Sequence, residues 1–116
     1  MPPTTGFSFG EIVLVPFPFT DQTAVKRRPA VVISSAAYHQ ARPDLILMAV
    51  TSRVRGERTV GEVVLQHWQE AGLIKPSVIK PILTTVETHV VLKKLGHLSP
   101  QDQQALKTVL ATIMGE

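Results

Sequence analysis

The sequence contains no cysteine in its 116 residues. This absence excludes a disulfide framework and thiolate sites, and it suits a reducing compartment such as the cytoplasm. Aromatic residues make up only 5%, which disfavours a stacking platform for bases and predicts an aliphatic core. No apolar run approaches the roughly 20 residues that span a bilayer, and the N-terminus lacks a signal-peptide pattern. We therefore expect a cytoplasmic protein with no membrane contact.

Several standard catalytic motifs are also missing. The sequence has no glycine-rich phosphate loop, no G-x-S-x-G elbow and no recognisable pair of carboxylates. Its four histidines are scattered, without the i,i+4 spacing of common metal ligands. We expect no metal and no cofactor.

Positive charge is concentrated in one part of the chain. The formal net charge is only +3, but seven of the twelve Lys and Arg residues lie between positions 26 and 58. A basic cluster of this kind is typical of a surface that binds nucleic acid. The triplet of Lys26, Arg27 and Arg28 stands directly before Pro29 and an apolar run, where three like charges favour a visiting anion such as phosphate.

Short apolar segments separated by turn residues occupy most of the chain. They predict a single domain over residues 1–116, with a flexible N-terminus at 1–9 and an antiparallel, barrel-like sheet. Pro81 predicts an edge or a bulge. The predicted strands are 11–17, 30–35, 45–52, 59–65 and 77–86, and 89–95 is ambiguous. Residues 39–44 carry turn residues, and 66–72 fit one helical turn.

The C-terminal segment predicts an amphipathic helix at 100–114. Ser99 is a suitable N-cap, Pro100 suits the first helical position, and Asp102 stands three residues after the cap. The apolar residues follow with helical spacing and should be buried against the sheet or a partner subunit. They are Leu106, Val109, Leu110 and Ile113.

Arginine and hydroxyl side chains stand at the ends of two predicted strands. If strands 30–35 and 45–52 are antiparallel neighbours, the entrance of one lies beside the exit of the other. Arg28 would then face Thr51 and Ser52. A guanidinium beside a hydroxyl offers several donors to a phosphate, although a surface arginine near a strand-end cap would have the same pattern.

Three segments, "GEIVLVPFPFTD", "KRRPAVVIS" and "VTS", resemble the MazF/PemK (Kid-like) toxins of type II toxin–antitoxin systems. "GLIKPSVIK" and "KKLGHLS" continue the resemblance over nearly the whole chain from Gly10. It implies a small SH3-like antiparallel β-barrel with a C-terminal helix, and a homodimer. It also implies sequence-selective, metal-independent cleavage of single-stranded RNA, and a cognate antitoxin that occupies the RNA groove.

The resemblance assigns the catalytic roles to Arg28 and Thr51. It places a covering loop at 20–26, and the segment "SVIKPILTTVE" is one residue shorter than the family pattern, without its acid–glutamine pair. Ser77 and Lys80 are the polar candidates left there. The predicted RNA-binding residues are Asp21, Lys26, Arg27, Ser52, Arg53, Arg55, Arg58, Ser77 and Lys80.

The simplest mechanism is attack by the 2′-hydroxyl of the RNA on the neighbouring phosphodiester. Arg28 would stabilise the developing charge and Thr51 would donate a hydrogen bond to it. Arginine is a poor base at neutral pH, so the sequence does not identify the proton acceptor. Two alternatives stay open: a CcdB-like toxin of the same fold that binds gyrase, and a non-catalytic RNA-binding member that lost activity with the shortened segment.

Overall fold

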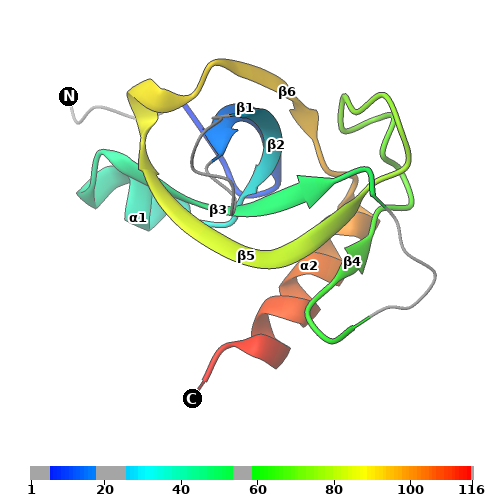
Figure 1. The fold of residues 1–116 in the computed structure, drawn as a ribbon. Helices are drawn as coiled ribbons and strands as arrows, with labels where there is room; N and C mark the ends of the chain where they lie inside the picture. The colour runs from blue at the N-terminus through cyan, green and yellow to red at the C-terminus, as the bar shows by residue number, and fades with distance from the viewer. Residues whose placement is uncertain (1–5, 18–25, 54–58, 116) are drawn as a thin grey trace.

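The computed structural model describes residues 6–17, 26–53 and 59–115. Within these ranges six strands form one antiparallel sheet in the order β4-β5-β3-β2-β1-β6. The sheet bends into a half-barrel with a helix, α2, at the C-terminal end of the chain (Figure 1). The strands are β1 (Glu11–Phe17), β2 (Lys26–Val32), β3 (Asp44–Thr51), β4 (Val63–Val64), β5 (Val78–Glu87) and β6 (Lys93–His97), and α2 is Pro100–Ile113. The predicted fold is confirmed.

β3 and β5 are each shifted by one residue from their predicted bounds, and three other strands differ more. β2 begins at Lys26, because the basic triplet pairs with the second half of β1, and it ends at Val32. β4 contains only Val63 and Val64 rather than the predicted segment 59–65. The ambiguous segment divides into a 3₁₀ turn, η1 (Thr88–Val90), and β6, which pairs with β1.

A short helix, α1 (Ala36–Ala41), was not predicted. Its N-cap is Ser35, whose hydroxyl accepts a hydrogen bond from the backbone N–H of Tyr38. His39 of this helix is buried, 2.6 Å from the Ser34 hydroxyl, and its other ring nitrogen lies 3.1 Å from the Phe7 carbonyl oxygen. Residues 66–72 form the predicted helical turn, which ends at Gly72 with φ of +82°.

Pro81 marks a bulge, as predicted. Met48 pairs with Leu83 of β5, but Val50 pairs with Ile79, so residues 80–82 stand opposite a single residue of β3. A proline fits there because the ladder with β3 is interrupted and a donor N–H is not required. β5 is long and strongly bent, as Figure 1 shows.

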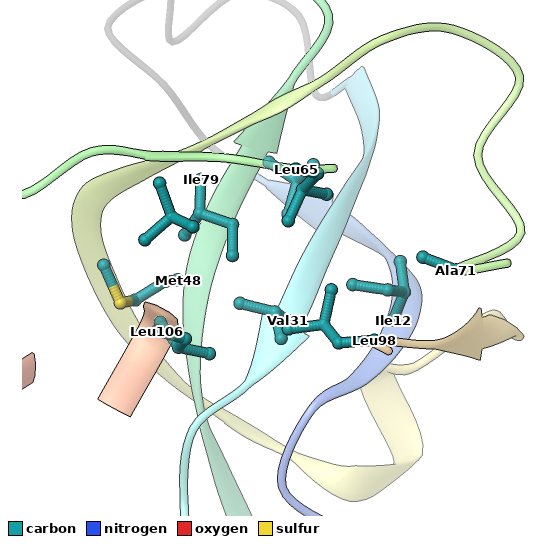
Figure 2. Packing of buried hydrophobic residues seen from close by; sticks show 10 residues of the cluster. Ile12, Val31, Met48, Leu65, Ala71, Ile79, Leu98 and Leu106 are labelled. Atoms are coloured by element: carbon teal, nitrogen blue, oxygen red, sulfur yellow. The ribbon is translucent and has the colours of Figure 1, made fainter. Parts of the chain in front are cut away.

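The first face of the sheet is covered by α2, which is capped as the sequence predicts. The Ser99 hydroxyl accepts a hydrogen bond from the Asp102 backbone N–H, and the Asp102 carboxylate accepts two more from residues 66 and 67. Leu106 is fully buried, and the other three residues of the predicted apolar stripe pack half-buried against the same cluster. Figure 2 shows Leu106 among residues of this cluster, which include Val31 and Met48.

The second face of the sheet has its own buried cluster. It is formed by residues of β1, β2 and β3, with Phe7, Val86 and Val91 packed against it. Phe7 and Phe9, from the expected flexible N-terminus, are both half-buried against the fold, and residues 1–5 lie outside the described ranges. Among the described residues, no helix is long and apolar enough to cross a membrane.

Candidate active site

Strand pleating divides the residues of β2 between the two faces of the sheet. Successive side chains of a strand point to opposite faces. Val31 belongs to the cluster beneath α2, whereas Ala30 and Val32 belong to the second cluster. Arg28 stands two residues before Ala30, so its side chain lies on the same, second face of the sheet. Its partner in β1 is the buried Val15.

Arg28 and Thr51 each lie two residues beyond the last paired residues of β2 and β3. Ala30 pairs with Ala49 and Val32 with Leu47, and the same register, continued by two residues, sets Arg28 opposite Thr51. Both side chains are half-buried and lie on the second face. Cross-strand neighbours have Cβ atoms about 5 Å apart, close enough for both side chains to contact one small anion.

The Thr51 hydroxyl is oriented by the turn that follows β3. Its Oγ1 accepts a hydrogen bond of 3.1 Å from the Arg53 backbone N–H. A hydroxyl that accepts in this way still carries a proton to donate. On its other side, Thr51 pairs with Val78 of β5, which is buried. Thr51 is therefore held by its pairing with β5 and by the turn after β3, with its hydroxyl available as a donor.

The basic triplet does not act as one patch. Lys26 and Arg28 have the same parity and share the second face, while the alternation of the strand turns Arg27 to the opposite face. Lys26 and Arg27 are both exposed. Ser52 and Arg53 are also exposed, directly after the last residue of β3. Three predicted residues, Lys26, Ser52 and Arg53, are therefore close in the chain to Arg28 and Thr51, and Arg27 lies on the opposite face.

Ser77 lies beside this region but is buried, with 4% of its surface exposed. Its hydroxyl donates a hydrogen bond of 2.8 Å to the Lys75 carbonyl oxygen, and its own carbonyl accepts one from the Leu65 N–H. These contacts close the turn before β5. Its proposed contact with RNA stays a prediction.

Lys80 is paired with an acidic residue that the sequence analysis missed. Its Nζ lies 2.5 Å from Glu62 Oε2, and the Thr59 hydroxyl donates to the same oxygen at 3.1 Å. The hydrogen bond from Lys80 lowers the pKa of Glu62; desolvation opposes this shift, and the Thr59 hydrogen bond adds to it. Glu62 is therefore ionised at neutral pH and neutralises the charge of Lys80.

A cross-strand register explains the pair of Glu62 and Lys80. Val63 pairs with Ile79, and the same register continued by one residue sets Glu62 opposite Lys80. The sequence signal for this pair was the alternation of side chains in "GEVV" and "VIK". It could match Glu62 with Lys80 only once β4 and β5 were known to be neighbouring strands. Three predicted RNA-binding residues, Asp21, Arg55 and Arg58, lie outside the described residues.

The aligned pair can stabilise a phosphate. Arg28 supplies a permanent positive charge and a planar set of N–H donors, and Thr51 supplies one O–H donor. Neither group is a ready proton acceptor at neutral pH. The arrangement is therefore suited to stabilising charge that develops on a phosphodiester.

Known proteins agree with this architecture. The family model for the PemK-like, MazF-like toxin of type II toxin–antitoxin systems matches residues 8–114. No curated protein matches the chain significantly. Among solved structures, MazF from Deinococcus radiodurans is 24% identical with a TM-score of 0.71, covering 94% of this chain and 96% of that one.

Two mycobacterial structures are similar as well. An endoribonuclease in complex with its cognate antitoxin, from Mycobacterial species, has a TM-score of 0.74 at 16% identity, covering 92% of this chain and 93% of that one. The Mycobacterium tuberculosis toxin MazF-mt6 has a TM-score of 0.70 at 19% identity, covering 88% and 93%. At these identities the structures support the fold, and the family model covers almost the whole sequence. The chain belongs to the family of PemK-like, MazF-like toxins of type II toxin–antitoxin systems.

Proposed function

We propose that this toxin is a metal-independent endoribonuclease that cleaves single-stranded RNA in the cytoplasm. The observation that carries the proposal is the register of β2 and β3, which, continued by two residues, sets Arg28 opposite Thr51 on one face of the sheet. A guanidinium and a hydroxyl on the same face of two neighbouring strands match the needs of a phosphodiester that gains negative charge as it reacts.

The reaction uses the 2′-hydroxyl of the RNA as the nucleophile. Its oxygen attacks the adjacent phosphorus, a bond from phosphorus to O2′ forms, and the bond from phosphorus to O5′ breaks. The 2′-hydroxyl loses its proton, and the departing 5′-oxygen takes up a proton. The products are a 2′,3′-cyclic phosphate on one fragment and a 5′-hydroxyl on the other.

Arg28 and Thr51 act on the phosphate rather than on the protons. The guanidinium stabilises the charge that builds up on the non-bridging oxygens, and the Thr51 hydroxyl donates a hydrogen bond to the same group. The Arg53 backbone N–H orients that hydroxyl before the RNA arrives. A hydroxyl that is already oriented requires little reorganisation during the reaction.

A homodimer and a cognate antitoxin complete the proposal. Two of the similar structures are toxins in complex with an antitoxin, one from Mycobacterial species and one from Deinococcus radiodurans. We expect an antitoxin to compete with RNA for the basic residues around Arg28. Gyrase binding is not favoured, since the family model and the similar structures are those of MazF-type toxins.

The proposal is tested by incubating the protein with single-stranded RNA, with and without EDTA, and analysing the fragment ends. We expect cleavage in EDTA that leaves 2′,3′-cyclic phosphate and 5′-hydroxyl ends. A 2′-deoxy substitution at the cleaved nucleotide should abolish the cut, because it removes the nucleophile. Binding without cleavage would support the non-catalytic alternative, and fragments with 5′-phosphate ends would refute the mechanism.

A further inference from the structure

The basic triplet contains two exposed cations that strand pleating separates. Lys26 and Arg27 are neighbours in β2 and pair with Phe17 and Pro16 of β1. Lys26 lies on the face of Arg28 and Thr51, whereas Arg27 lies on the face of Pro29 and the buried Val31. Two side chains of equal charge that are adjacent in sequence therefore lie on different faces of the sheet.

The spacing of Lys26 and Arg28 suits consecutive phosphates of one RNA strand. Two residues of a β-strand advance about 7 Å along the sheet. An extended RNA chain separates its neighbouring phosphates by a similar length. With one phosphate at Arg28 and Thr51, the next one along the strand direction of β2 reaches Lys26 without a change of face.

We infer that Lys26 binds the phosphate that flanks the cleaved one, and that Arg27 makes no contact with the RNA. This inference rests on the proposed function, because it takes Arg28 and Thr51 as the place of cleavage. A lysine suits such a flanking contact, since its flexible stem and compact charge hold a phosphate without fixing its orientation. Arg28, with its planar donors, is suited to the reacting phosphate.

The inference predicts different salt dependences for two neighbouring substitutions. Each phosphate contact on a single strand contributes about 0.7 to the slope of log affinity against log salt concentration. Lys26→Ala should make the slope shallower by about 0.7. The ratio of wild-type affinity to Lys26→Ala affinity should therefore fall about 2.5-fold when the salt concentration rises from 50 to 200 mM. Arg27→Ala is the matched control and should leave the slope at the wild-type value. Lys26→Arg should restore it.

Binding should be measured with an RNA oligonucleotide that carries a 2′-deoxy nucleotide at the mapped cleavage position, or with the unmodified RNA if the wild type does not cut it. Equal loss of slope in Lys26→Ala and Arg27→Ala would overturn the inference, because a general electrostatic attraction would then explain both. An unchanged slope in Lys26→Ala would also overturn it. Cleavage of the unmodified RNA by the wild-type protein tests the proposed function separately.

Discussion

Replacing Arg28 tests the chemistry of the aligned pair most directly. Arg28→Ala removes the guanidinium but keeps the backbone pairing of residue 28 with Val15. Loss of one preorganised donor to a developing oxyanion costs about 10²-fold or more in rate. At about 1.36 kcal/mol per tenfold, this corresponds to about 2.7 kcal/mol of transition-state stabilisation. We expect the cleavage rate of Arg28→Ala to fall by at least this factor.

A second substitution at residue 28 distinguishes the effect of its charge from the effect of its donor geometry. Arg28→Lys keeps a positive charge but loses the planar, two-pronged donor set, so we expect it to be on the order of tenfold slower or worse. Single-turnover cleavage at saturating enzyme measures the chemical step without the contribution of binding. Thermal unfolding serves as the control, because a lower cleavage rate reports on chemistry only if the variant is folded at the assay temperature. If Arg28→Ala cleaves at the wild-type rate, Arg28 is only a binding residue and the catalytic assignment is wrong.

Three further substitutions test the framework that supports the site. Leu106→Ala should cost about 2–5 kcal/mol of unfolding free energy, since Leu106 is fully buried on the inner face of α2, and a melting temperature within a few degrees of wild type would contradict this. Gly72→Ala should be destabilising by about 2 kcal/mol or more, because φ is +82° and the new Cβ would lie 1.9 Å from a carbonyl oxygen. Gly115→Ala, with no atom within 4 Å of the new Cβ, is its control and should be neutral in the same melts. Glu62→Gln should be destabilising at neutral pH, because it removes the ion pair with Lys80. The pKa of Glu62 is lowered in the folded protein, so the stabilisation from this pair is complete above the pKa of Glu62 in the unfolded chain. It is lost as the pH falls through the pKa of Glu62 in the folded protein. The difference in melting temperature from wild type should therefore shrink below about pH 4, and a constant difference down to lower pH would refute the role of the pair.

The helix at the C-terminus shows what local sequence can determine. The cap at Ser99, the proline after it and the spacing of the apolar residues define α2 to within one residue. The same is true of β1, whose apolar run coincides with the observed strand. Such features rest on interactions between residues close in sequence, so they can be inferred without knowledge of the fold. Helix α1 was missed because it has only six residues, and the turn residues Pro43 and Asp44 follow it closely.

The candidate site shows the limit of the same reasoning. Sequence spacing and family resemblance both pointed to Arg28 and Thr51, and their alignment required only that the two strands be antiparallel neighbours. The sequence did not show on which face of the sheet each cation lies. Strand alternation separates Lys26 from Arg27, but which of them accompanies Thr51 depends on the register with β1 and β3.

Lys80 is a residue whose environment could not be inferred from its neighbours in the sequence. In the sequence it is an unpaired cation on a strand, and a contact with RNA is a reasonable interpretation. In the fold, β4 is brought beside β5 and sets Glu62 against it, 18 residues away along the chain. Local sequence was enough to infer most of the helices and strands, the cluster of positive charge and the residue types suited to phosphate. The tertiary structure determined which charges face the same surface and which are already neutralised, because these depend on strand neighbours and register rather than on local pattern.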